Sequence, residues 1–79
     1  MEKLVERVAE VLVSVSDKAR GHIGESGLVS KGILDSLDIM NLIMELEAVF
    51  DIEIDPEDVL SDNFESVESI ARLVEKCQG

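Results

Sequence analysis

The residues of this sequence that could do chemistry centre on Ser36, which follows Asp35 and lies two positions before Asp38. A serine hydroxyl becomes a nucleophile when a neighbouring base removes its proton. The only histidine, His22, lies in a glycine-rich stretch with no cysteine or second histidine beside it. The sequence therefore gives no support to a hydrolase. Ser36 is better placed to be a hydroxyl that another enzyme modifies.

A structural role for Ser36 is the simpler alternative. Serine is among the best N-cap residues, because its side chain accepts a hydrogen bond from a backbone N–H group that the helix leaves unpaired. We expect Ser36 to be the N-cap of a helix that runs to about Phe50. On this interpretation alone, Ser36 would have no chemical function.

The acidic residues after this helix match a calcium-binding loop only in part. Asp51, Glu53 and Asp55 stand at positions 1, 3 and 5 of such a loop, and Asp62 stands at position 12. Position 6 is Pro56 instead of the required glycine, and position 12 lacks the longer glutamate. We therefore expect no dedicated metal site.

The helix that follows Ser36 has two apolar faces, whereas a surface helix in a small domain needs only one. At 100° per residue, the face expected in the core consists of Ile39, Leu42, Ile43, Leu46, Val49 and Phe50. A second stripe lies almost opposite and consists of Leu37, Met40, Met44 and Ala48. Methionine adapts to several partner shapes. We expect the second stripe, with the acidic residues Asp38 and Glu47 beside it, to dock partner proteins.

The N-terminal half predicts one helix and one long loop. Apolar residues at helical spacing indicate a helix from Glu2 to about Lys18. Its expected buried face is Leu4, Val5, Val8, Val11, Leu12 and Val15. The connection from Gly21 to Asp35 is rich in glycine, and loops of such length in a small domain are often functional. We expect Leu28 or Val29, and also Ile33, to turn from this loop into the core.

The C-terminal third predicts two more helices. Asp55 as N-cap and Pro56 as the first helical residue begin a short one. Ser66 or Asn63 caps the last helix, whose expected buried face is Val67, Ile70, Ala71 and Val74. The predicted fold class is all-α: a small four-helix bundle with three main helices, one short third helix, and a long loop between the first two helices.

Composition and charge limit the classes of function. The chain of 79 residues has 18 acidic and 7 basic residues, hence a net charge of −11. This charge repels nucleic acids and anionic membranes and favours reversible contact with basic protein surfaces. The single cysteine, Cys77, cannot form an internal disulfide, and no apolar run approaches the roughly 20 residues of a transmembrane helix. We expect one soluble cytoplasmic domain over residues 1–79, with no role for His22 or Cys77.

The chain resembles the phosphopantetheine-dependent carrier proteins, which include acyl carrier proteins and the related aminoacyl and peptidyl carriers. The resemblance covers nearly the whole chain and is strongest at Gly32-Ile33-Leu34-Asp35-Ser36-Leu37. The other matching residues are Leu42, Leu46-Glu47, Phe50-Asp51-Ile52-Glu53-Ile54, Asn63-Phe64 and Ser66-Val67. Asp-Ser-Leu is a weak signal by itself. Placed before this helix and with these later matches, it is specific.

The resemblance implies a carrier and not an enzyme. Ser36 would hold a covalent 4′-phosphopantetheine, a transferase would add the group from coenzyme A, and Asp35 would lie where that transferase and its metal can reach it. The terminal thiol of the arm would hold acyl or aminoacyl intermediates as thioesters. The implied partners are a phosphopantetheinyl transferase, an acyl- or aminoacyl-activating enzyme, and a downstream synthase or transferase. Neither nucleic acid binding nor membrane insertion is implied, and we expect a monomer.

Two features leave the cargo open. Carriers of fatty acid biosynthesis usually have one residue between the glycine and the aspartate of the motif, whereas this chain has Ile33 and Leu34. They also carry more acids where this chain has Asn41 and Ala48. The motif is similar to that of aminoacyl, D-alanyl or peptidyl carriers loaded by adenylating enzymes. An alternative of another class is an unmodified helical interaction module, in which Ser36 is only a helix cap.

Overall fold

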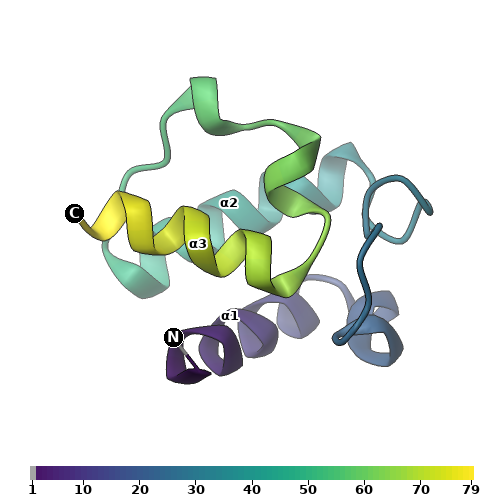
Figure 1. Cartoon of the computed structure of the whole chain (residues 1–79). Helices are drawn as coiled ribbons and strands as arrows, with labels where there is room; N and C mark the ends of the chain where they lie inside the picture. The colour runs from purple at the N-terminus through teal and green to yellow at the C-terminus, as the bar shows by residue number, and fades with distance from the viewer. Residues whose placement is uncertain (1) are drawn as a thin grey trace.

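The structure is a computed structural model that describes residues 2–79, except for the side chain of Ser61. It contains the helices α1 (Glu2–Val15), α2 (Ser36–Phe50) and α3 (Val67–Gln78), and the 3₁₀ helices η1 (Asp17–His22), η2 (Pro56–Asp58) and η3 (Ser61–Phe64) (Figure 1). Residues 2–79 contain no strand. The predicted all-α class is confirmed. No helix among these residues combines the length and apolar character needed to cross a membrane.

Helix α1 ends at Val15, so the prediction that it continues to Lys18 is wrong. Ser16 leaves the helical conformation, with φ −138° and ψ 104°, although its N–H still donates to the carbonyl of Leu12 at 2.8 Å. The chain then turns into η1, which buries Ala19 in the core. The break redirects the chain toward the start of α2, and the apolar periodicity of α1 does not reveal it.

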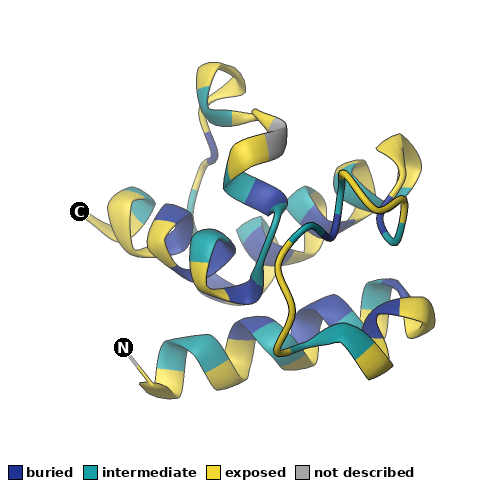
Figure 2. Ribbon diagram, turned by 45° about the vertical axis from the view of Figure 1, so that its right-hand side comes forward, coloured by how far each residue is buried: buried dark blue, intermediate teal, exposed yellow. Residues whose placement is uncertain are grey.

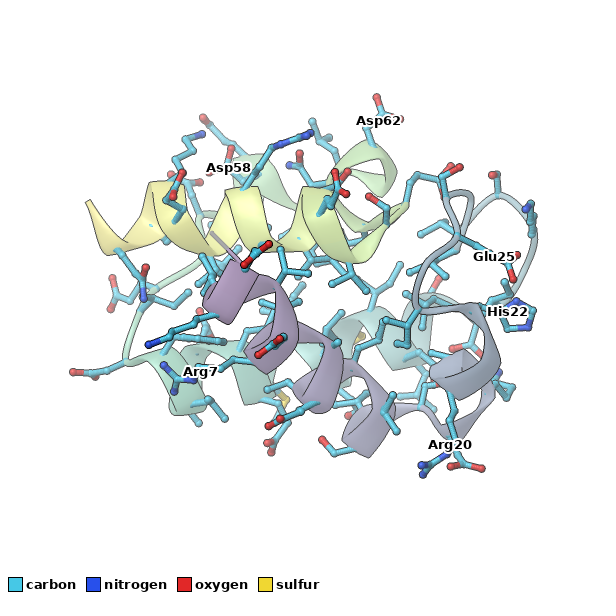
Figure 3. The ribbon with its side chains drawn as sticks, turned by 60° about the horizontal axis from the view of Figure 1, so that its bottom comes forward. Arg7, Arg20, His22, Glu25, Asp58 and Asp62 are labelled. Atoms are coloured by element: carbon cyan, nitrogen blue, oxygen red, sulfur yellow. The ribbon has the colours of Figure 1, made fainter. Side chains whose placement is uncertain are left out.

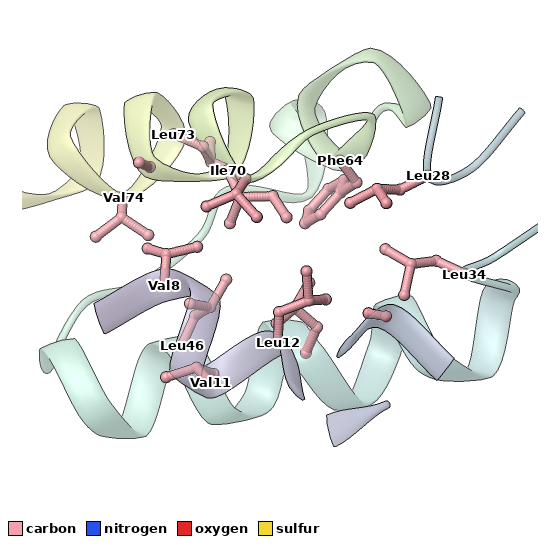
Figure 4. Packing of buried hydrophobic residues seen from close by; sticks show 14 of the residues in the cluster. Val8, Val11, Leu12, Leu28, Leu34, Leu46, Phe64, Ile70, Leu73 and Val74 are labelled. Atoms are coloured by element: carbon pink, nitrogen blue, oxygen red, sulfur yellow. The ribbon is translucent and has the colours of Figure 1, made fainter. Parts of the chain in front are cut away.

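The core consists mainly of aliphatic side chains from the three helices, with Leu28, Leu34 and Phe64 added from the connecting segments. Figure 4 shows Val8, Val11 and Leu12 of α1 with Leu46 of α2 and Ile70 of α3. Phe64 is fully buried and closes one end of this core beside Leu28 and Leu34. The buried faces turn toward one another, and most of the outward surface of the helices is exposed (Figure 2).

The long loop is anchored to the beginning of α3. The N–H group of Leu28 donates to the carbonyl of Glu65 at 2.8 Å. The carboxylate Oε1 of Glu65 accepts from the N–H groups of Val29, at 2.7 Å, and Ser30, at 2.9 Å. These hydrogen bonds keep the pKa of Glu65 below its ordinary value, with the Ser30 N–H as the largest cause. Glu65 therefore ties together two segments that lie far apart in the sequence.

The residues that turn inward from this loop differ partly from the prediction. Leu28 is fully buried, as one of the two expected alternatives, while Val29 and Ile33 are only partly buried. Leu34 is the second deeply buried residue, at 2% exposure, and its N–H donates to the carbonyl of Leu28 at 2.8 Å. Gly32 makes the turn between them with φ +77°, a conformation that side chains disfavour. With the turn closed by this hydrogen bond, the side chain of Leu34 lies in the core and that of Ile33 is only partly buried.

The segment before α3 matches the prediction in its caps. Asp55 caps η2, since its Oδ1 accepts from the N–H of Glu57 at 2.9 Å, and Pro56 is the first residue of η2. Ser66 caps α3 by accepting from the N–H of Ser69 at 3.1 Å. Asn63 has a different role, because its Nδ2 donates to the carbonyl of Asp58. The expected short third helix is thus realised as the 3₁₀ turns η2 and η3.

The start of α1 and the end of α3 lie at one end of the bundle, and η1, the long loop and the start of α2 lie together at the other (Figures 1 and 2). Ser36 is therefore presented at the end of the molecule where the loop is braced.

Leu46 and Met44 can be used to test which face of α2 is buried and which is exposed. Leu46 is fully buried, whereas Met44 is 65% exposed. We expect Leu46→Ala to lower the free energy of unfolding by about 2–5 kcal/mol, because it removes buried methyl groups and leaves a cavity. Met44→Ala should change it by no more than about 0.5 kcal/mol. Urea denaturation measures both, and similar losses in the two variants would contradict the orientation of α2.

The Glu65 anchor can be tested by amide hydrogen exchange. Glu65→Ala should accelerate exchange at Val29 and Ser30 by about tenfold, since it removes their charged acceptor. Because the pKa of Glu65 is lowered in the folded chain, the anchor holds above that pKa and weakens as the pH falls through it. Glu68→Ala is the matched control, because Glu68 pairs with Arg72 on the surface of α3. Equal acceleration in both variants would count against the anchor.

Candidate functional site at the start of α2

The start of α2 is capped by Asp35 and not by Ser36, so the prediction that Ser36 is the N-cap is wrong. Asp35 has extended backbone angles, and its Oδ1 accepts from the N–H of Asp38 at 2.8 Å. Oδ2 of Asp38 accepts in return from the N–H of Asp35 at 3.3 Å. This reciprocal capping box satisfies two backbone donors at once.

The spacing of the acids explains why the helix begins one residue earlier than expected. A capping box needs an acceptor side chain three positions after the cap. Asp35 has Asp38 at that position, whereas a cap at Ser36 would have Ile39, which accepts no hydrogen bond. The sequence therefore contained the signal, and the strong cap preference of serine obscured it.

Ser36 is the first residue of α2, and its side chain is exposed. Because Asp35 and Asp38 make the cap hydrogen bonds, the Ser36 hydroxyl has no part in holding the helix end. The N-terminus of a helix carries partial positive charge and free N–H groups, which favour an attached anion. The site thus offers an accessible hydroxyl where a negatively charged group can be accommodated.

The charges around Ser36 are two carboxylates and one ammonium group. Nζ of Lys18, from η1, lies 3.3 Å from Oδ2 of Asp38. The pKa of Asp35 is lowered, first by the hydrogen bond from the Asp38 N–H and also by the Lys18 ammonium and the Leu37 N–H. Asp35 is therefore ionised under ordinary conditions, as its capping role requires.

The second stripe of α2 faces solvent. Leu37 is 64% exposed, Met40 61% and Met44 65%, and Ala48 is exposed as well. The expected core face holds for Leu42, Leu46 and Phe50, which are buried, and for Ile39 and Ile43, which pack partly against the core. Val49 is the exception at 42% exposure, so its predicted burial is wrong. An uncovered apolar stripe thus begins directly beside Ser36.

The protein-family model of the phosphopantetheine attachment site matches residues 2–74, which is almost the whole chain. The chain belongs to this family. The cofactor of the chain is accordingly a covalently attached 4′-phosphopantetheine, as the sequence resemblance implied.

Several carrier proteins are similar to the chain. The aminoacyl carrier protein 1 of Bradyrhizobium diazoefficiens is 40% identical over 50 residues, which are 63% of this chain and 54% of that protein. The acyl carrier protein homolog of Mycoplasmopsis pulmonis is 35% identical over 66 residues, 84% of this chain and 88% of its own. The D-alanyl carrier protein of Lactococcus lactis is 32% identical over 73 residues, 90% of this chain and 91% of its own. No solved structure matches the chain.

The start of α2 fits the cofactor of the family. A phosphodiester needs an accessible hydroxyl and compensation for its negative charge. The exposed Ser36 hydroxyl satisfies the first requirement. The N–H groups of the first turn of α2 and the Lys18 ammonium are the positive groups at this end of the helix.

Two acids expected to help dock partners are engaged in contacts within the chain itself. Asp38 is only 17% exposed and bonds to Asp35 and Lys18. Oε2 of Glu47 accepts from the N–H of Ile54 at 3.0 Å and so holds the connection after α2. The sequence did not reveal these partners. Docking by Leu37, Met40, Met44 and the two acids stays a prediction.

The other titratable side chains do not converge on Ser36. Nδ1 of His22 lies 3.0 Å from Oε2 of Glu25 (Figure 3). Nζ of Lys31 lies 3.5 Å from Oε1 of Glu25. The His22 contact is the main cause of the lowered pKa of Glu25. Burial raises the pKa of the Cys77 thiol, at the far end of α3. Within residues 2–79, no group of three or more histidine, cysteine or acidic side chains is arranged to hold a metal ion.

The cap assignment can be tested by comparing neighbouring variants. We expect Ser36→Ala to change the free energy of unfolding by no more than about 0.5 kcal/mol, because the hydroxyl makes no cap hydrogen bond. Asp35→Ala should lower it clearly more, since it removes an N-cap acceptor. Urea denaturation at neutral pH measures the difference, and a larger loss for Ser36→Ala would restore Ser36 as the cap.

The pH dependence of the same cap provides a control. The pKa of Asp35 is lower in the folded than in the unfolded chain, so its contribution to stability is present above the unfolded value and is lost as the pH falls through the folded one. Asp35→Asn keeps an acceptor oxygen but does not titrate. Its stability should therefore fall less steeply on acidification than that of the unaltered protein.

Proposed function

We propose that the chain is a discrete carrier protein in which Ser36 bears the 4′-phosphopantetheine. The observation that carries this proposal is the division of roles at the start of α2. Asp35 and Asp38 close the helix end, so the exposed Ser36 hydroxyl is available for modification without loss of the cap. The second stripe begins at the next residue and is available to enzymes that act on the arm.

Loading of the carrier is a phosphoryl transfer to serine. Oγ of Ser36 forms a bond to the phosphorus that carries pantetheine in coenzyme A, the bond from that phosphorus to the adenosine bisphosphate breaks, and the hydroxyl proton leaves. The arm supplies a terminal thiol that holds cargo as a thioester. Among residues 2–79, the only histidine pairs with Glu25, and the Asp35 and Asp38 carboxylates are engaged in the cap. The transferase would therefore supply the general base, and the carrier itself would catalyse nothing.

The proposed partners are a phosphopantetheinyl transferase, an acyl- or aminoacyl-activating enzyme, and a downstream synthase or transferase. Leu37, Met40 and Met44 would provide the apolar contact with them. The net charge of −11 favours partners with basic surfaces and disfavours nucleic acids. We further propose that residues 1–79 act as one cytoplasmic, monomeric carrier domain.

The cargo is an acyl or an aminoacyl group. The names of the similar proteins include an aminoacyl carrier, an acyl carrier homolog and a D-alanyl carrier, so both classes are represented. The Ile33-Leu34 spacing of the motif supports an aminoacyl or D-alanyl cargo loaded by an adenylating enzyme. The unmodified interaction module is less well supported, because it needed Ser36 as the cap and Asp35 has that role.

Intact-mass measurement tests the proposal. The apo protein, incubated with coenzyme A and a phosphopantetheinyl transferase of broad specificity, should gain the mass of one phosphopantetheine. Ser36→Ala should gain nothing. Ser26→Ala, which alters another exposed serine in the long loop, should be loaded like the unaltered protein. Absence of a gain in the unaltered protein, or an undiminished gain in Ser36→Ala, would refute Ser36 as the attachment residue.

A further inference from the structure

We propose that Lys18 is a positioning residue for the phosphodiester on Ser36: its ammonium group exchanges the Asp38 carboxylate for a phosphate oxygen once the arm is attached. This inference rests on the proposed function. Lys18 belongs to η1 and lies outside the motif around Ser36, so the inference gives η1 a role in holding the arm.

The position of Lys18 follows from the break after α1. Because Ser16 leaves the helix, η1 turns toward the start of α2, and Nζ of Lys18 reaches Oδ2 of Asp38 at 3.3 Å. The Lys18 side chain is 61% exposed, while that of Asp38 is 17% exposed. The lysine is thus the movable member of the pair, on a flexible four-carbon stem.

Lys18 is the basic residue whose ion pair lies at the attachment site. Of the 7 lysines and arginines, the others with ion pairs among residues 2–79 have partners elsewhere. These pairs are Arg20–Asp17, Lys31–Glu25, Arg72–Glu68 and Lys76–Asp58. Arg7 lies over the ring of Phe50, 4.6 Å from its centroid, at the opposite end of α2. A phosphate on Ser36 therefore finds its side-chain cation in Lys18.

The charges at the site explain why the exchange is favourable. Attachment of the arm adds a third anion to the first turn of α2, beside the Asp35 and Asp38 carboxylates. Both carboxylates are held in the capping box and cannot turn away. When Lys18 leaves, the Asp38 carboxylate still accepts the hydrogen bond from the Asp35 N–H, so it keeps a donor. Movement of Lys18 toward the new anion reduces the repulsion with the least rearrangement.

A thermodynamic cycle between Lys18 and the arm tests the inference. Apo and holo forms of the unaltered protein and of Lys18→Gln are unfolded in urea at low salt. Attachment of the arm should raise the unfolding equilibrium constant of Lys18→Gln more than that of the unaltered protein, by up to about five-fold. One exposed ion pair is the upper limit, because Lys18 gives up its pair with Asp38 in the exchange. At about 1 M salt this difference should vanish, because the Debye length is then about 3 Å.

Matched variants and a second readout complete the test. Lys18→Arg should restore the behaviour of the unaltered protein, and Lys31→Gln, which removes a lysine paired in the loop, should also behave like it. Reductive methylation of Lys18, followed by peptide mass spectrometry, should be slower in the holo than in the apo form, with Lys31 unchanged as internal reference. This readout uses the unaltered protein and does not depend on the stability of a variant.

The outcomes separate this inference from the function on which it rests. If Ser36 is not loaded at all, both are wrong. If Ser36 is loaded but Lys18→Gln and Lys31→Gln respond alike to the arm, and methylation of Lys18 is the same in both forms, only the assignment of Lys18 is overturned. A specific response of Lys18 that salt removes would establish it.

Discussion

The reciprocal capping of α2 by Asp35 and Asp38 is the interaction on which the proposed site depends. It determines where the helix begins, and it leaves the Ser36 hydroxyl free of the capping role. With the cap at Asp35, Ser36 takes the first helical position, and Leu37, Met40 and Met44 point to solvent. Leu42 and Leu46 point to the core in the same register. The free Ser36 hydroxyl therefore follows from one pair of hydrogen bonds, and the exposed apolar stripe begins at the next residue.

This cap has to be held in place relative to the core, and the long loop does this from two sides. Leu28 and Leu34 are buried near Phe64, and their mutual backbone hydrogen bond closes the turn that leads to Asp35. Glu65 fixes the other side of the loop through Val29 and Ser30. The geometry at Ser36 is therefore coupled to the beginning of α3, almost thirty residues later in the chain.

Local patterns in the sequence predicted most of the helices, because apolar periodicity and caps are local properties. The buried faces of α1 and α3, the cap at Asp55 and the cap at Ser66 were all readable in this way. The cap of α2 was readable as well, because Asp35 has an acidic residue three positions later and Ser36 does not, although serine is by itself a strong N-cap residue.

What a single sequence could not show are contacts between segments that the fold brings together. Nothing local marks Glu65 as the acceptor for Val29 and Ser30, or Lys18 as the partner of Asp38. The early end of α1 was also not visible in the sequence, because the burial of Ala19 in η1 competes with continuation of the helix. The exposure of Val49 is similar, since α1 and α3 cover only part of the predicted apolar face of α2.

The internal use of acids changes what a partner would meet at the proposed docking surface. The carboxylates of Asp35, Asp38 and Glu47 accept hydrogen bonds from backbone N–H groups. They are therefore less available for direct ion pairs with a partner. The net charge of −11 would still act at a distance, where it would steer the proposed basic partners and raise their rate of encounter. Close contact would then fall to Leu37, Met40 and Met44, whose exposed apolar side chains would lose water on binding. Under the proposed function, long-range attraction and close contact would thus come from different residues, which suits a carrier that must dock and leave repeatedly.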